Sequence, residues 1–311
     1  MKYMAFDRLT EAILRTKNPS VVGLDPKLSY VPEFIKEEAF ELYGRTLKGA
    51  ARAVLAYNKG IIDAICDIVP AVKPQCAYYE ALGPHGMKTL AKTIAYAKKR
   101  GMYVIIDGKR NDIGTTMDAY ADAHLGKTLV EDISYAPFDG DALTVNGYLG
   151  TDGIEPLIKR CDAFGKGIFV LVKTSNPSSG ELQDKLIDGL PVYRHMGALC
   201  EEWGKHSVGL HGYSACGAVV GATYPEQLAE LRIALPHTFF LVPGYGAQGG
   251  GAAGVAPAFD ERGLGAVVNS SRAVLCAYLK DGDEREYAQA ARREAIRMRD
   301  DLVAHIPALQ Q

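Results

Sequence analysis

The sequence has few cysteines, and none stands in a spacing typical of a metal site or a redox pair. The six, at positions 66, 76, 161, 200, 216 and 276, include no CxxC pair and no Cys/His ligand pattern. Cys66, Cys76, Cys161 and Cys276 lie in or beside apolar segments, where a small buried hydrophobic side chain is the usual role. We therefore expect reduced thiols and a cytoplasmic protein.

An excess of one charge and long apolar runs are also missing. The formal net charge is -2, which provides no field that would attract nucleic acid or an anionic membrane. No apolar stretch approaches the ~20 residues that span a bilayer. The N-terminal segment, MKYMAFDRLTEAILRTKN, has no apolar core of the signal-peptide kind. We expect neither a nucleic-acid nor a membrane partner, and an anionic ligand would need a local cluster of cations.

Short apolar runs recur along the chain. There are eight: SVVGLD (20–25), IVPAVKPQ (68–75), MYVIIDGK (102–109), ALTVNGY (142–148), GIFVLVKT (167–174), GAVVGAT (217–223), TFFLVPG (238–244) and GAVVNSSR (265–272). Near-continuous Val, Ile and Leu predict strands that are buried on both faces, as in parallel sheets covered by helices.

Helix-like patterns alternate with these runs. They lie at 37–65, 83–100, 224–235 and 283–304, and Asp7 is the predicted N-cap of a further helix near the N-terminus. Eight βα units predict an α/β fold, a single (β/α)8 TIM barrel over residues 1–311 with extra N- and C-terminal helices. A doubly wound open sheet is the structural alternative. Connections at 26–60 and 175–216 account for a length above the ~250 residues typical of this barrel.

Charged residues gather where three successive predicted strands end. They are Asp25, Lys73, Asp107, Lys109 and Asp112. Any one of them alone is explained as a solvated loop charge, but in a barrel these strand ends meet at the face that carries the active site. Asp107 and Lys109 are two apart on an extended chain, so their side chains are expected to point the same way. A lysine flanked by carboxylates stays protonated, which suits a proton donor better than a Schiff-base amine.

One of these segments has a specific sequence pattern. IIDGKRNDIGTT (105–116) resembles the orotidine 5'-monophosphate decarboxylase signature D-x-K-x-x-D-I-[G/P]-x-T at every fixed position. Asp25 in GLDP and Lys73 in AVKPQ also lie where that family has them. The resemblance implies a barrel enzyme that converts orotidine 5'-monophosphate, its small-molecule substrate, into UMP and carbon dioxide without a metal or an organic cofactor.

The resemblance also implies roles for the charged residues. Lys109 would protonate C6 as carbon dioxide leaves, and Asp107 would lie beside the substrate carboxylate. Lys73 and Asp25 would bind ribose hydroxyls and hold the array.

A further implication of the resemblance is a homodimer with shared active sites. Asp112, Ile113 and Thr116 are expected to reach into the site of the neighbouring subunit.

A glycine-rich segment, TFFLVPGYGAQGGGAAG (238–254), follows the seventh run. Its GxGxxG pattern at 244–249 is also found in dinucleotide-binding sites. Such a site needs a helix directly after the glycines and an acidic residue at the end of the next strand. Here Pro257 interrupts the chain after the glycines, and the next run ends in Arg272. A phosphate site fits better, because loops after the seventh and eighth barrel strands often hold phosphate. The candidate residues are Pro243, Gln248, Gly249, Ser271 and Arg272, with Ser271 standing where many family members have glycine.

The loop after the fifth run, KTSNPSSGELQD (173–184), resembles the family's pyrimidine-contacting loop. Ser175 is the residue we expect at the base edge, with Ser178 and Ser179 as open alternatives. Asn146 ends the predicted fourth strand and faces the same end of the barrel, where we expect it to cap a turn rather than to contact a ligand.

Two other functions remain open at this point. One is a related barrel phospho-sugar decarboxylase or synthase, which usually needs Mg²⁺. The other is a non-catalytic barrel that binds the phosphate of a nucleotide, because the fold alone does not choose a function.

Overall fold

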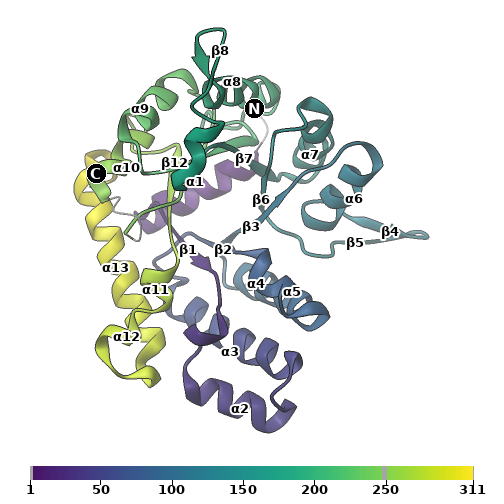
Figure 1. Cartoon of the computed structure of the whole chain (residues 1–311), viewed down its shortest axis with the longest axis vertical. Coiled ribbons are helices and arrows are strands. Elements are labelled where there is room, and N and C mark those ends of the chain that lie inside the picture. Colours follow the sequence, from purple (N-terminus) through teal and green to yellow (C-terminus); the bar gives the residue numbers. More distant parts are fainter. Residues whose placement is uncertain (1–2, 247–250, 311) are drawn as a thin grey trace.

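All eight apolar runs form strands, and these close into a parallel barrel in the order β1-β12-β11-β10-β7-β6-β3-β2 (Figure 1). The computed structural model describes residues 3–246 and 251–310. The barrel strands are β1 Ser20–Leu24, β2 Ala71–Pro74, β3 Tyr103–Arg110, β6 Ala142–Val145, β7 Gly167–Lys173, β10 Cys216–Val220, β11 Phe240–Val242 and β12 Ala266–Ser270. The (β/α)8 barrel is confirmed, and the open sheet is wrong because β1 pairs with both β2 and β12.

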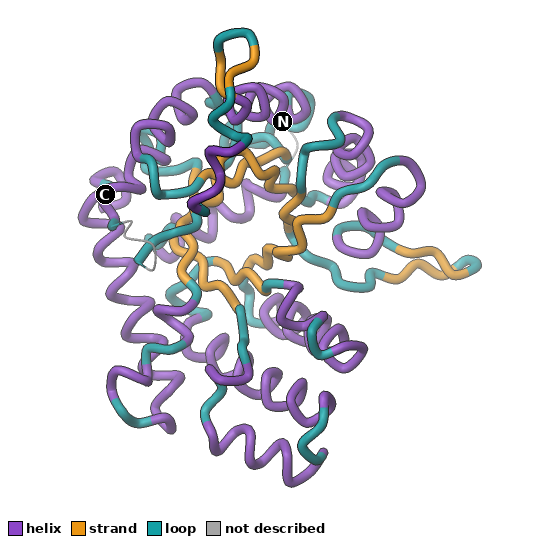
Figure 2. Tube along the Cα trace, in the orientation of Figure 1, coloured by secondary structure: helices purple, strands orange, loops and turns teal. Residues whose placement is uncertain are grey.

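Helices surround the strands as an outer layer (Figure 2). They are α1 Ala5–Thr16, α2 Glu33–Tyr43, α3 Leu47–Ile65, α4 Cys76–Glu80, α5 Gly83–Lys99, α6 Gly114–His124, α7 Thr151–Phe164, α8 Val192–Gly204, α9 Pro225–Ala234, α10 Ala252–Val255, α11 Arg272–Leu275, α12 Tyr278–Asp281 and α13 Tyr287–His305. Short 3-10 turns are η1 Leu28–Tyr30, η2 Pro177–Glu181, η3 Ala256–Ala258, η4 Glu284–Glu286 and η5 Pro307–Gln310. Every residue of β1, β6, β10 and β12 is buried, as expected for parallel strands between a packed interior and a helical shell.

The N-terminal helix α1 closes one end of the barrel. Its Phe6 ring lies 4.9 Å from the ring of Phe169 in β7 and 5.0 Å from that of Phe239, just before β11. These residues stand at the amino ends of their strands, so α1 covers that end of the barrel. The carboxyl ends of the strands form the open end, where barrel enzymes place their active sites.

The start of α1 differs from the prediction. The N-cap is Met4, and Asp7 stands three positions later. The Asp7 carboxylate accepts a hydrogen bond from the Met4 backbone N–H at 2.7 Å. Asp7 therefore caps the first turn from inside the helix, which is the reciprocal half of a capping box.

The predicted helix at 37–65 is wrong as a single element, because the chain breaks between α2 and α3. Gly44 takes a φ of 72°, a left-handed value that favours glycine. Thr46 then caps α3, its hydroxyl accepting a hydrogen bond from the Gly49 N–H at 3.1 Å. The predicted 283–304 segment likewise divides into η4 and the long helix α13.

Two hairpins project from the barrel, formed by β4 Thr128–Val130 with β5 Ile133–Tyr135 and by β8 Leu186–Ile187 with β9 Leu190–Pro191. The second lies in the predicted 175–216 connection, which also holds η2 and α8. All six cysteines are free; Cys66 and Cys276 are only partly buried, and the other four are buried. Among the described helices, none has both the length and the hydropathy needed to cross a membrane.

Candidate active site

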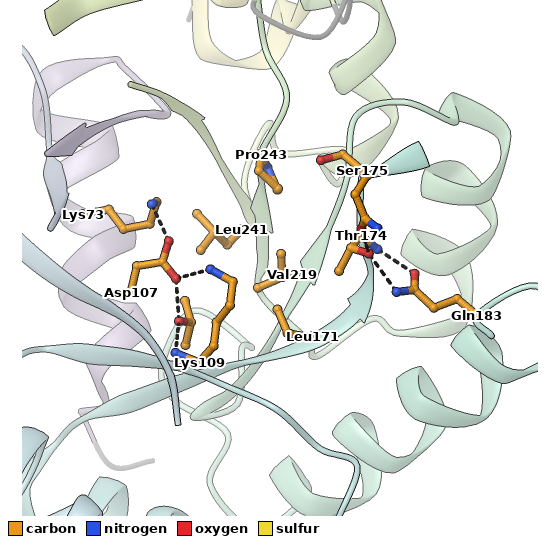
Figure 3. Close-up of a pocket in the computed structure, with 12 residues that line it drawn as sticks. Lys73, Asp107, Lys109, Leu171, Thr174, Ser175, Gln183, Val219, Leu241 and Pro243 are labelled. Carbon is orange, nitrogen blue, oxygen red and sulfur yellow. Dashed lines mark hydrogen bonds and ion pairs between the residues drawn. The ribbon is translucent and has the colours of Figure 1, made fainter. Parts of the chain in front are cut away.

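A buried carboxylate held between two lysines forms the centre of the open end of the barrel (Figure 3). Lys73 in β2 donates to Asp107 in β3, with Nζ 2.7 Å from Oδ2. Lys109 donates to the other oxygen of the same carboxylate, also at 2.7 Å. The Lys73 and Asp107 side chains are nearly inaccessible, whereas that of Lys109 is 48% exposed. Lys73 and Asp107 thus form a rigid, buried pair at the cavity wall, and Lys109 is the member of the cluster with the greatest exposure to solvent.

The electrostatics of this cluster keep its members charged. Burial by itself raises the pKa of Asp107, but the ammonium groups of Lys73 and Lys109 outweigh it and hold that pKa well below its ordinary value. Burial lowers the pKa of Lys73, yet the nearby Asp107 and Asp25 carboxylates reverse the effect and raise it. Asp107 is therefore an anion, and Lys73 a cation, at neutral pH.

The backbone at Lys109 is not regular strand. Its φ is 49°, in the left-handed region where a residue other than glycine is uncommon, and the pairing register between β3 and β6 shifts at this point. The predicted meeting of Asp107 and Lys109 is correct, but the reason we gave for it is wrong, because the chain is not extended there. Thr144 of β6 holds the distortion: its hydroxyl accepts from the Lys109 N–H at 3.0 Å and donates to the Asp107 carboxylate at 2.7 Å.

A cavity of about 490 Å³ opens beside this cluster. It is lined by Lys73, Asp107, Lys109, Thr144, Leu171, Thr174, Ser175, Asn176, Gln183, Val219, Leu241 and Pro243. The charged cluster lies on one side and the polar residues after β7 on the other, with apolar side chains between them (Figure 3). A few polar groups around an apolar floor are typical of a small-molecule site.

The loop that follows β7, residues 174–184, supplies the polar side opposite the lysines; we call it the β7 loop. Ser175 lines the cavity as predicted, whereas Ser178 and Ser179 do not. Ser175 packs against Gly221 after β10, where an added Cβ would lie 2.9 Å from the Ser175 backbone nitrogen. The absence of a side chain at residue 221 therefore allows the β7 loop to lie this close to the barrel.

Sequence reasoning missed several residues of this site. Thr144 was visible as the lone hydroxyl in an apolar strand segment, but nothing marked it as the residue that supports Lys109. Gln183 is nine residues from Thr174 in sequence, so only the folded loop brings it to the cavity. Asn146 was expected in a turn, and its side-chain oxygen does accept a hydrogen bond from the Tyr148 N–H.

Asp25 lies close enough to the cluster to raise the pKa of Lys73 but does not line the cavity. Its Oδ1 atom is buried and has no hydrogen-bond partner among the described residues. A buried carboxylate oxygen without a partner is costly unless a ligand or water satisfies it. Asp25 is thus placed to accept a hydrogen bond from a bound molecule.

The residues after Lys109 turn away from this cavity. Asp112, Ile113 and Thr116 are not among its lining residues, and Ile113 and Thr116 are exposed. Within the part of the chain that the structure describes, the Asp112 carboxylate accepts a hydrogen bond only from the adjacent Ile113 N–H, at 2.8 Å.

The structure describes only part of the predicted phosphate site. Pro243 lines the cavity, while Gln248 and Gly249 lie outside the described residues. Arg272 begins α11 and is exposed, but neither it nor Ser271 lines the cavity. Ser271 has a φ of -116°, which residues other than glycine readily adopt, so serine is no obstacle to this backbone.

Comparisons with known proteins agree on one family. Residues 46–288 match the model of the "Orotidine 5'-phosphate decarboxylase / HUMPS family". A curated orotidine 5'-phosphate decarboxylase of Rhodopirellula baltica is 47% identical over 300 residues, which cover 95% of this chain and 97% of that protein. A solved chain from Toxoplasma gondii is 29% identical with a TM-score of 0.78 and covers 98% of both chains. The structure of Leishmania donovani OMP decarboxylase is 28% identical with a TM-score of 0.70 and covers 96% of this chain and 99% of that one.

Proposed function

The chain belongs to the orotidine 5'-phosphate decarboxylase / HUMPS family, and we propose that the cavity at the open end of its barrel is where its reaction takes place. The protein is a carbon–carbon lyase (EC 4.1.1.23) that converts orotidine 5'-monophosphate into UMP and carbon dioxide, in pyrimidine nucleotide synthesis. The observation that carries this placement is the Asp107 carboxylate held between Lys73 and Lys109 beside an apolar cavity.

In the proposed reaction, Lys109 is the proton donor. The bond between C6 and the carboxylate breaks, its electron pair stays on C6, and carbon dioxide leaves. The Lys109 ammonium stabilises the developing negative charge and transfers a proton to C6, which gives UMP. Because the Lys109 side chain is half exposed, it can recover a proton from solvent for the next turnover.

Asp107 and Lys73 prepare the site for this step. Asp107 lies beside the substrate carboxylate, and its low pKa keeps it ionised. The repulsion between the two carboxylates is relieved when carbon dioxide departs. Lys73 and Asp25 bind ribose hydroxyls, an assignment supported by the unpartnered Asp25 Oδ1.

The phosphate of the substrate is held beyond Pro243, outside the lining of the described cavity. We assign it to Arg272, the neighbouring Ser271 and the loop that contains Pro243, Gln248 and Gly249. Binding energy from a phosphate remote from C6 can be used to order the site in the transition state. No step of this mechanism uses a metal or an organic cofactor.

We also propose that residues 1–311 are a single domain that forms a cytoplasmic homodimer with shared active sites. The exposure of Ile113 and Thr116, and the position of Asp112 away from the cavity of its own chain, support a role for this segment in the site of a second copy.

The test is a cuvette assay of purified protein with orotidine 5'-monophosphate and no added metal. The absorbance of orotidylate should fall, and EDTA should leave the rate unchanged. Activity that EDTA abolishes would favour a metal-dependent relative of the same barrel. Binding of UMP without any turnover would instead favour a non-catalytic nucleotide-binding barrel.

A further inference from the structure

The structure points to Lys173 as a positioning residue. It holds the β7 loop in place as one wall of the cavity, in the geometry that binds the pyrimidine base. This inference rests on the proposed function, because the base is recognised only if orotidine 5'-monophosphate is the ligand. Nothing in the sequence pattern marks Lys173, which ends the apolar run GIFVLVK.

Lys173 is a buried charge outside the reacting cluster. Its side chain is 1% exposed, and its Nζ donates to the Asp184 carboxylate at 2.6 Å and to the Ser179 hydroxyl at 3.4 Å. The ammonium also lies 5.6 Å from the centre of the Tyr193 ring and 5.2 Å from that of Tyr224. Burying a lysine is costly unless it is paired, so these partners define one position for the group.

The partners of Lys173 show what it holds. Asp184 is the last residue of the β7 loop and Lys173 directly precedes the loop, so their ion pair closes it into a ring. A second tie lies just inside the first: the Thr174 N–H donates to the Gln183 side-chain oxygen at 2.9 Å, and the Gln183 amide donates to the Thr174 hydroxyl at 2.7 Å. Both ends of the loop are thus fixed side by side, and its residues do not need to be ordered by the ligand.

The tied loop provides a large share of the cavity wall. Thr174, Ser175, Asn176 and Gln183 all line the cavity opposite Lys109, as Figure 3 shows for Thr174, Ser175 and Gln183. Lys173 itself does not line the cavity. It therefore acts through the loop and is not a catalytic residue.

The two partners of the ion pair are not equivalent. The Asp184 side chain is 41% exposed, so it can be solvated when Lys173 is replaced by an apolar residue. Lys173→Met thus removes the tie without leaving a buried charge, whereas Asp184→Asn leaves the buried ammonium with a neutral partner. Lys173→Met is the cleaner variant, and Asp184→Asn is the second one.

The experiment compares ligands with and without the base. In calorimetric titrations of the full chain, Lys173→Met should weaken UMP binding about tenfold, as expected if the loop is correctly ordered only a tenth of the time. Ribose 5-phosphate, which lacks the base, should bind within about twofold of wild type, because the phosphate end does not depend on the loop. In turnover, the KM for orotidine 5'-monophosphate should rise about tenfold while kcat changes little, because saturating substrate restores the ordered loop.

Matched variants separate positioning from a general structural role. Lys185→Met removes a charge from the exposed neighbouring position and should behave as wild type. Asp184→Asn should reproduce the base-selective loss, and it decides the matter if Lys173→Met does not fold. Equal losses for UMP and ribose 5-phosphate, a fall in kcat at unchanged KM, or no change at all would overturn the inference. A wild-type protein that does not turn over orotidine 5'-monophosphate would instead overturn the proposed function.

Discussion

At the scale of single residues, charge and burial decide which groups can react. The Asp107 carboxylate accepts a hydrogen bond from each lysine, and both lysines line the cavity, but only the Lys109 side chain is largely exposed, at 48% against 7% for Lys73. Lys73 is enclosed, and its raised pKa makes it a poor proton donor. The division of labour between two otherwise similar lysines thus follows from exposure.

Replacement of Lys109 by alanine tests its assignment as proton donor. We expect Lys109→Ala to abolish turnover, measured by loss of orotidylate absorbance, because the proposed mechanism gives C6 no other proton donor and Lys73 stays paired with Asp107. UMP binding should remain measurable, since the proposed phosphate contacts are untouched. More than a few per cent of wild-type activity would show that another group delivers the proton.

His124 gives a prediction for stability against pH. It is buried at the end of α6, stacked 5.2 Å from the Phe138 ring, and its Nδ1 has no hydrogen-bond partner among the described residues. Burial, with a smaller contribution from Arg110, lowers its pKa to about 4 from 6.5. Between these values the unfolded chain binds more protons than the folded one. Stability from this residue is therefore complete above pH 6.5 and is lost as the pH falls towards 4.

We expect His124→Phe to remove this pH dependence, which amounts to about 3 kcal/mol between pH 6.5 and 4 from the pKa difference. Urea unfolding of wild type and variant across that range measures it. His85→Phe, at an exposed position, serves as the control. Parallel stability profiles for wild type and His124→Phe would contradict the assignment.

At the scale of elements, the site depends on irregular segments held by regular ones. The strands place Asp107 and Lys73, but the distortion at Lys109 and the β7 loop complete the cavity. Each irregular segment depends on a residue in or just after a neighbouring strand. Thr144 accepts a hydrogen bond from the Lys109 N–H, and Gly221 leaves room for Ser175.

Gly221→Ala tests the contact between β10 and the β7 loop. The new Cβ would lie within 3.0 Å of Ser175 backbone atoms, so one side has to move. Because Gly221 is buried and Ser175 is partly exposed, we expect the loop to shift and the barrel to hold. Overpacking of this kind costs about 1–3 kcal/mol, so the KM for orotidine 5'-monophosphate should rise about tenfold.

The matched control for this variant is Gly254→Ala, whose added Cβ would meet nothing nearer than 3.8 Å. Steady-state kinetics measure both variants. An unchanged KM in Gly221→Ala would mean that the position of Ser175 does not govern substrate binding.

At the scale of the whole molecule, one end of the barrel is closed by α1 and the other carries the cavity. The segment from Asp112 to Thr116 lies at this open end but outside the cavity of its own chain. In the proposed homodimer, a second copy related by a twofold axis would receive this segment and provide its own in return.

Subunit mixing tests the shared site. Lys109→Ala and Asp112→Asn homodimers should each be nearly inactive. In a hybrid dimer, one site collects both changes and the other has neither. One-to-one mixing makes about half of the dimers hybrid, so about a quarter of wild-type activity should return.

Exchange of subunits must be verified separately, for example with differently tagged chains. If exchanged mixtures stay inactive, Asp112 acts within its own chain and the shared-site proposal is wrong.

The sequence by itself determined the eight strands, the barrel and the Asp107–Lys109 pair. Continuous apolar runs and a tightly spaced motif are local properties, which the chain carries whatever its surroundings. The single helix predicted over 37–65 was an error that local sequence could have prevented, since Gly44 and Thr46, which end one helix and cap the next, are both visible in the sequence.

Only the tertiary structure decided what depends on contacts between distant segments. Thr144 in β6 supports Lys109 in the neighbouring strand β3. The lack of a side chain at Gly221 makes room for Ser175. The eleven-residue β7 loop returns Asp184 to Lys173, with which it forms an ion pair. No regular spacing in the sequence marks these pairs of residues. In the sequence, Lys173 looks like any other charged residue at a strand end, because its partner Asp184 is brought to it only by the folded loop. Their physical effect, which is to compensate burial and to fix irregular backbone, arises only when the barrel closes.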